Sequence, residues 1–184
     1  LRAGNDPSIT PGGGDTFASY GIGWANLSNT PFRLYKHFVH EGGIATPFIA
    51  FAPQVIEDPN SLRRTPGHVI DLLPTCAELA GAVYPTERAG DALPPLAGRS
   101  LVDVLRGSDT IERRLFWEHE GNRAVRHGNW KLVARGWKGA WELYDLSSDR
   151  TEQNDLAELE PERVEGMSAA WDTWALEQRV LPRP

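Results

Sequence analysis

The sequence predicts a mixed α/β chain that ends in a small antiparallel sheet packed on a C-terminal helix. Segments rich in aromatic and β-branched residues follow one another after residue 113, reading "RRLFWEHE", "NRAVRHGNWKLVA" and "AWELYDL". The closing segment instead repeats apolar residues at helical spacing, at Val164, Met167, Trp171 and Trp174. We therefore expect three or four antiparallel strands, with this apolar stripe packed on them.

The first half of the chain alternates between loops and short apolar segments. Residues 1–31 are rich in Gly, Pro, Ser, Asn and Thr and predict a long loop. "PFRLYKHFVH" predicts a short helix, because Pro31 suits the first helical turn. The apolar run "IATPFIAF" at residues 44–51 predicts a buried core strand. Proline-rich or glycine-rich loops are expected at residues 53–67 and 82–99.

Two further helices carry recognisable end signals. In "HVIDLLPTCAELAG", Asp71 is the predicted N-cap, Pro74 falls in the first turn, and Gly81 occupies the C-terminal glycine position. "SLVDVLRG" predicts a short amphipathic helix with Ser100 as its cap and Gly107 as its stop.

Composition predicts a folded chain that binds neither nucleic acid nor the interior of a membrane. The 184 residues are 40% hydrophobic and 24% charged, which is typical of a folded chain. The change in sequence character at residue 113 predicts a division into residues 1–112 and 113–184. The net charge of −6 argues against a nucleic-acid surface, which is normally basic. No stretch approaches the roughly 20 apolar residues of a membrane span. The first residues do not form a signal peptide. The chain starts at Leu1 without an initiator methionine, so we expect a piece of a longer protein.

Cys76 is the only cysteine, which excludes an internal disulfide and a cysteine-based zinc site. Its neighbours predict a packed helix, so we expect a buried thiol that behaves as a small hydrophobic residue. A catalytic thiol needs an exposed, electropositive setting, which the flanking residues do not supply.

Lys36 is the first candidate for chemistry, because its ammonium group offers three donors to a tetrahedral oxyanion. A solvated lysine on a helix face is the simpler alternative. Gly42 and Gly43 favour the functional interpretation, since glycine permits a close backbone approach or a positive φ that a surface helix does not need. His37 and His40 lie one helical turn apart, but "HFVHE" is not the H-E-x-x-H pattern of zinc proteases. Structural histidines are the better interpretation.

Other polar residues have weaker patterns. Asp145, Asp149, Glu152 and Asp155 form an acidic run without the alternating ligands and central glycine of an EF-hand, so a solvated connection with local caps is expected. His119 in "WEHEGN" fits a site approached from the sheet and a locally hydrogen-bonded histidine equally well. Most of the seven tryptophans lie at strand or helix spacing, which predicts core packing.

Several segments, taken together and in order, resemble the C-terminal half of the formylglycine-dependent sulfatases, in their bacterial arylsulfatase branch. "SYGIGWANLSNTPFRLYKHFVHEGGIATPFIAF" is similar to the family segment with a sulfate-contacting lysine five residues before Glu-Gly-Gly. "HVIDLLPTCAELAG" and "LAGRSLVDVLRG" resemble its Asp-x-x-Pro-Thr helix and Gly-x-Ser-Leu element. "LFWEHEGNRAVRHGNWKLV" and "WELYDLSSDRTEQNDLA" resemble its C-terminal subdomain.

The resemblance implies an alkaline-phosphatase-like α/β fold and a complete enzyme that hydrolyses a small-molecule or sugar sulfate ester. In that family a Cys or Ser becomes formylglycine, whose hydrate attacks sulfur, and a calcium ion held mainly by aspartates and an asparagine orients the sulfate. Lys36 would hold a sulfate oxygen and stabilise the leaving oxygen. Glu41, Gly42 and Gly43 would shape the loop that aims Lys36.

The chain also departs from the family pattern. The Cys/Ser-x-Pro-x-Arg nucleophile motif is absent, and Cys76 does not match it. The Asp-Asn pair expected upstream of Lys36 is missing, because "GNDP" at residues 4–7 has the wrong order. No metal ligand is therefore assigned within the chain, and the 184 residues alone are expected to hydrolyse nothing.

Two alternatives remain open from the sequence. A phosphodiesterase or phosphonate hydrolase of the same superfamily also surrounds a tetrahedral anion with cations, so Lys36 does not exclude it. The second alternative is a non-catalytic protein, either a remnant or a module that pairs with a partner chain. For this alternative we expect poor solubility, because the strand at residues 44–51 would have an open edge. The sulfate ester, the compartment and the oligomeric state stay undetermined.

Overall fold

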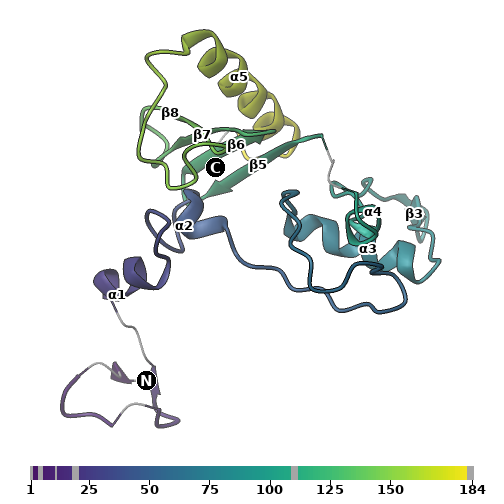
Figure 1. Cartoon of the computed structure of the whole chain (residues 1–184), viewed down its shortest axis with the longest axis horizontal. Helices are drawn as coiled ribbons and strands as arrows, with labels where there is room; N and C mark the ends of the chain where they lie inside the picture. The colour runs from purple at the N-terminus through teal and green to yellow at the C-terminus, as the bar shows by residue number, and fades with distance from the viewer. Residues whose placement is uncertain (1, 4–5, 11, 18–20, 109–111, 182–184) are drawn as a thin grey trace. The chain divides into compact units, whose positions relative to one another are not determined.

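The computed structural model describes residues 2–3, 6–10, 12–17, 21–108 and 112–181. Two compact units share the chain: Leu1–Thr46 together with Arg114–Pro184, and Pro47–Arg113 (Figure 1). The second unit is thus an insertion in the sequence of the first. The predicted division between residues 112 and 113 concerns the intact protein and stays a prediction.

A four-stranded antiparallel sheet forms the centre of the first unit, as the sequence predicts. Its strands pair in chain order as β5 (Arg114–His119), β6 (Asn122–His127), β7 (Trp130–Ala134) and β8 (Glu142–Asp145). His127 pairs with Trp130 across a tight turn that includes Gly128, whose φ is +59°. The predicted turn is confirmed, since a positive φ is the geometry that glycine accepts without strain.

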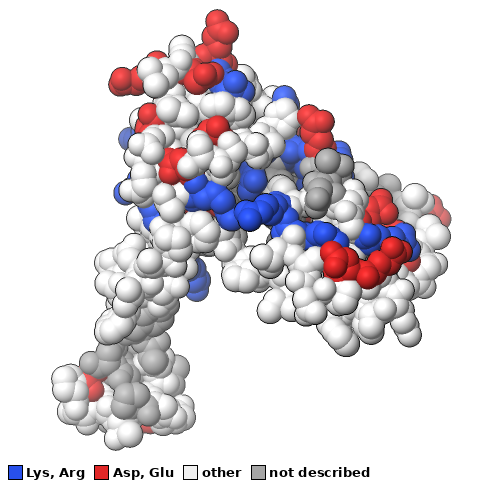
Figure 2. Space-filling model, in the orientation of Figure 1, with Lys and Arg blue, Asp and Glu red and all other residues white. Residues whose placement is uncertain are grey.

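Helix α5 (Pro161–Glu177) covers one face of this sheet (Figure 1). Met167, Trp171 and Ala175 are buried against Val125 and Leu132, and Val164 and Trp174 pack around them. The predicted apolar stripe is confirmed. Acidic side chains are prominent around α5 in Figure 2, on the side of the helix away from the sheet.

The opposite face of the sheet is covered by the segment around α2 (Glu41–Ile44). The neighbouring strand residues Ala124, Val133 and Tyr144 point to this side and pack with Val39. Successive residues of a strand face opposite sides, so a sheet buried on both faces needs apolar residues at consecutive positions. "AV" in β6, "LV" in β7 and "LY" in β8 meet that need.

The segment before residue 41 differs from the sequence prediction in two ways. Residues 1–31 contain a short parallel pair, β1 (Arg2–Ala3) with β2 (Thr16–Phe17), and helix α1 (Gly21–Ser28), so the prediction of a loop throughout is wrong. The predicted helix over "PFRLYKHFVH" is a series of turns, because Leu34 and His37 have φ values of +67° and +100°. A right-handed helix cannot pass through residues in that conformation.

The predicted buried strand at residues 44–51 is also wrong. Ile44 ends α2, and the residues after it form no strand. Phe48, Ile49 and Phe51 are 65%, 90% and 90% exposed. A strand needs a neighbour for its backbone hydrogen bonds, and no described strand pairs with this segment.

The second unit contains η1 (Val69–Asp71), α3 (Leu72–Leu79), α4 (Val102–Leu105) and a short hairpin within residues 82–99, β3 (Glu87–Arg88) with β4 (Asp91–Ala92). The two helices are as predicted, and Gly81 and Gly107 follow them with positive φ. The cap differs, because His68 caps the first turn. Asp71 is instead fully buried, paired with Arg113 and bonded to the backbone N–H of Arg99 at 3.0 Å.

Cys76 is exposed on α3, so the prediction of a buried thiol is wrong. The hydrophobic residues beside it in the sequence, Leu72, Leu73 and Leu79, are exposed too. Asp71 and Thr75 tie this helix to the rest of the second unit, because Arg113 pairs with Asp71 and the backbone N–H of Leu101 donates to Thr75 Oγ1 at 2.9 Å.

Candidate functional site

Lys36 lies on an exposed turn of the first unit, between Leu34 and His37 with their positive φ values. Tyr35 and Phe38 pack edge to face, with ring centroids 5.3 Å apart, and close the turn on itself. Within the described part of the chain, Lys36 makes no ion pair. The turn therefore presents an uncompensated cation to solvent.

The base of this turn is fixed by a buried group of charges around Glu41. Lys131 of β7 is fully buried, and its Nζ lies 2.9 Å from Glu41 Oε1 and 2.8 Å from Glu152 Oε1. Glu152 Oε2 accepts the backbone N–H of Glu41 at 2.8 Å. Burial alone would raise the pKa of Glu41, but Lys131 and the nearby Arg126 and Arg150 outweigh it, so that pKa lies below its ordinary value.

A second polar group ties the start of the turn to β8. Arg33 Nη1 donates to Glu142 at 3.1 Å and to Tyr144 Oη at 2.7 Å, and Tyr144 Oη donates to the same carboxylate at 2.6 Å. The buried His40 ring lies 3.4 Å from that carboxylate. Hydrogen bonding to His40, against the effect of burial and helped by Tyr144 and Arg33, lowers the pKa of Glu142 to about 2. Burial and the bond to Glu142 raise the pKa of Tyr144.

Gly42 and Gly43 lie where side chains do not fit. A Cβ on Gly42 would overlap the carbonyl oxygens of Arg33 and Leu34, and one on Gly43 would overlap the carbonyl oxygen of Phe38. The backbone N–H of Gly42 donates to the Arg33 carbonyl at 3.1 Å. The two glycines thus allow α2 to pack directly under the turn, by close approach rather than by positive φ.

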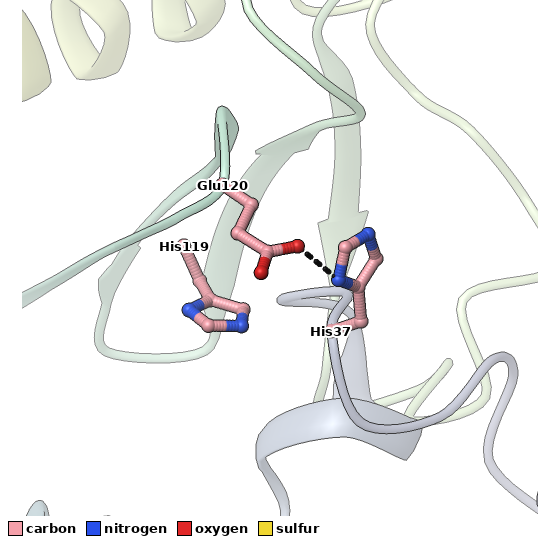
Figure 3. A group of neighbouring side chains, drawn as sticks. All are labelled: His37, His119 and Glu120. Carbon is pink, nitrogen blue, oxygen red and sulfur yellow. Dashed lines mark ion pairs between the residues drawn. The ribbon is translucent and has the colours of Figure 1, made fainter.

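A separate cluster brings His37 together with His119 and Glu120 at the β5–β6 turn (Figure 3). The Glu120 carboxylate lies between the two imidazole rings and forms an ion pair with His37 Nδ1. The ring centroids of His37 and His119 are 5.8 Å apart. The two predicted structural histidines therefore differ: His40 is buried in a hydrogen-bonded group, whereas His37 is exposed beside other possible ligands.

The acidic run is only partly the solvated connection that the sequence predicts. Asp145, Asp149 and Asp155 do accept local backbone N–H groups. Glu152 is instead fully buried against Lys131, so the expectation of a solvated residue is wrong for Glu152, and the sequence analysis missed Lys131. Among the described residues, the only group of three or more His, Cys, Asp or Glu side chains placed to hold a metal ion is that of His37, His119 and Glu120.

No helix in the described ranges has the length and apolar character that crossing a bilayer requires.

Comparison with known proteins relates the chain to sulfatases. An uncharacterized sulfatase of Schizosaccharomyces pombe is 34% identical over 178 residues, which cover 92% of this chain and 32% of that protein. A sulfatase of Formosa agariphila is 34% identical over 151 residues, covering 73% of this chain and 26% of that protein. Arylsulfatase K of Xenopus laevis is 28% identical over 176 residues, covering 91% of this chain and 32% of that protein. The chain thus spans about a quarter to a third of these relatives.

Solved structures give a partial match. A 2-O GAG sulfatase is 28% identical, with a TM-score of 0.44 over 59% of this chain and 24% of that protein. No protein-family model matches the chain.

Proposed function

The chain is homologous to the C-terminal region of sulfatases, and from this premise we propose that the intact protein hydrolyses sulfate esters, with Lys36 of this chain at the sulfate. The proposal also places the intact protein in the arylsulfatase branch of the sulfatases. The observation that carries it is the exposed Lys36, which makes no ion pair with any residue that the structure describes, on a turn whose base is held by buried charges, in a chain with this homology.

In the proposed reaction Lys36 acts as a point charge. Its ammonium group donates to a sulfate oxygen in the ground state and stabilises negative charge on the ester oxygen as the bond to sulfur breaks. Glu41, Gly42 and Gly43 set the position of the turn and do not touch substrate. Their part is to reduce the motion of Lys36, since a loosely held cation stabilises a transition state less well.

The described part of this chain has no residues that fit the calcium site of the family, and none that fit its formylglycine position. Calcium prefers six to eight oxygen ligands, whereas the cluster of His37, His119 and Glu120 offers two imidazoles and one carboxylate. Cys76 is followed by Ala-Glu-Leu, not by the residues of the nucleophile motif. Both groups would have to be supplied by other parts of the intact protein.

The substrate is proposed only as a sulfate ester of a small molecule or sugar. Relatives with a named substrate include an N-acetylgalactosamine-6-sulfatase of Mus musculus and a steryl-sulfatase of the same organism. These names cover chemically different alcohols, so they do not narrow the choice.

The test is hydrolysis of 4-nitrophenyl sulfate by the intact protein and by its Lys36→Ala variant. Removal of one such charge from an anionic transition state is expected to lower kcat/KM by about 10²- to 10³-fold. Lys138→Ala is the matched control, because Lys138 is an exposed lysine outside the turn, and it should keep wild-type activity.

Unchanged kcat/KM in Lys36→Ala would contradict the role of Lys36. Faster hydrolysis of 4-nitrophenyl phosphate than of the sulfate by the intact wild-type protein would favour the phosphodiesterase alternative. The 184-residue chain alone is expected to release no sulfate, and measurable turnover by it would overturn that expectation.

A further inference from the structure

We propose that His37, His119 and Glu120 form a binding site for a divalent transition-metal ion of the Zn²⁺ type. The proposal does not depend on the sulfatase function. Nitrogen and oxygen donors of this kind form three-ligand zinc sites, in which a water or a substrate atom takes the fourth position. All three side chains are exposed, so an ion can reach them from solvent.

The ligand atoms are already close. One atom from each side chain lies within 4.8 Å of the others. Ligands around a tetrahedral zinc ion lie roughly 3.3–3.6 Å apart, given bond lengths of about 2.0–2.2 Å. Small side-chain rotations at the surface close this gap. Figure 3 shows that the second oxygen of the Glu120 carboxylate is on the His119 side, so the carboxylate faces both rings.

The backbone brings these residues together by a specific contact. Asn122 is buried, and its Nδ2 donates to the carbonyl oxygens of His37 and of His119, each at 3.0 Å. One amide group therefore ties the turn that carries Lys36 to the β5–β6 turn. Asn122 Oδ1 also accepts the backbone N–H of Gly136 at 3.2 Å, which fixes the amide in place.

One of the three residues holds an unfavourable backbone conformation. His37 has a φ of +100° and is not glycine. Such conformations cost about 1–3 kcal/mol and often mark functional sites. Glu120, with a φ of +51°, lies in the two-residue β5–β6 hairpin turn, where a positive φ is the usual geometry.

Zinc titration of the 184-residue chain tests the site. The purified chain, freed of metal with EDTA, is titrated with Zn²⁺ in competition with a chromophoric chelator. We expect one equivalent to bind, and Ca²⁺ at the same concentration not to displace it, because calcium disfavours imidazole ligands. His119→Gln and Glu120→Gln should each weaken zinc binding by more than about 10-fold. Changes to residues that only contact a metal ligand already weaken binding by about that factor, and loss of a ligand itself should weaken it more.

Two control variants keep the result specific. His127 lies at the other end of the β5–β6 hairpin, where it pairs with Arg114, so His127→Gln should bind zinc as the wild type does. Cys76→Ser removes the exposed thiol and should also bind normally. Circular dichroism of each variant confirms that it is folded.

A second readout avoids the variants altogether. The imidazole NMR signals of His37 and His119 should shift on addition of one equivalent of zinc, while those of His127 stay in place. No bound zinc in the wild-type chain, equal binding by His119→Gln, or loss of binding in Cys76→Ser would each overturn the proposal.

Discussion

Lys131 is the single residue on which the base of the Lys36 turn most depends. It is fully buried between two carboxylates that are themselves buried, those of Glu41 and Glu152. Burying a charge is costly unless it is paired, so the three side chains stabilise the fold only as a set. Removing the cation leaves Glu152 without its ion pair and Glu41 with only the weaker influence of Arg126 and Arg150.

Lys131→Met is therefore expected to lower the free energy of unfolding by about 3–5 kcal/mol, the cost of breaking a buried ion pair on one side. Methionine replaces all of the lysine side chain except its last atom, so lost packing contributes little. Urea unfolding followed by tryptophan fluorescence measures the change. Lys138→Met, at an exposed position, should alter stability by less than about 0.5 kcal/mol. Similar values for the two variants would contradict this account.

Glu142 predicts a dependence of stability on acid pH. Its pKa falls from 4.5 to about 2 in the folded chain, so the native state binds the proton more weakly than the unfolded state. The stabilisation is complete above pH 4.5 and is lost as the pH falls toward 2. We expect Glu142→Gln to flatten the decline of unfolding free energy over this window. The control is Glu165→Gln, at an exposed position of α5, whose unfolding free energy should fall over this pH range as that of the wild type does.

At the scale of elements, local patterns predicted the sheet and α5 but not the segment between residues 31 and 51. The strands of the sheet alternate with clear turns, and α5 has a regular apolar stripe. Patterns between residues close in sequence were therefore enough to predict these elements. The turn at Lys36 instead depends on Leu34 and His37 in left-handed conformations, which side-chain type does not signal. The turn is held by residues distant in sequence, because Arg33 bonds to Glu142 of β8 and Asn122 of β6 donates to the His37 carbonyl.

The same reasoning explains what was missed at the site. Lys36, Glu41, Gly42 and Gly43 are close in sequence, so their pattern was visible, although their roles stay predictions. Glu41 and its partner Glu152 are 111 residues apart, and Asn122 contacts a carbonyl 85 residues away. No spacing rule links such residues, and the positive φ of Glu152, +57°, is a property of the folded chain only.

The close approach of α2 to the turn predicts the effect of a single methyl group. Gly43→Ala should destabilise the chain by about 1–3 kcal/mol, because its Cβ overlaps the backbone of Phe38, which cannot move without the turn. Gly166→Ala in α5 meets no atom within 4 Å and should instead stabilise by about 0.5–1 kcal/mol, as alanine does in a helix. Thermal unfolding measures both, and equal effects would show that α2 packs more loosely than described.

At the scale of the whole molecule, exposed hydrophobic residues gather after α2. Phe48, Ile49 and Phe51 follow one another on an unpaired segment. Contiguous apolar surface of this kind promotes association. We expect the 184-residue chain to bind a hydrophobic dye and to self-associate, and the double variant Ile49→Ser, Phe51→Ser to do both less. The control is Leu159→Ser, at an exposed leucine elsewhere in the chain, which should alter neither property. Light scattering measures self-association, and dye fluorescence measures dye binding.

The ion pairs of Glu41 also have a consequence for the order in which the protein is made. Glu41 leaves the ribosome before its ion-pair partner Lys131, which is 90 residues later, and the whole second unit is synthesised in between. At about 5–20 residues per second, this interval is on the order of ten seconds. Throughout it the Glu41 carboxylate lacks the cation that later neutralises it, so the turn that carries Lys36 is among the last parts of the nascent chain to reach its native geometry.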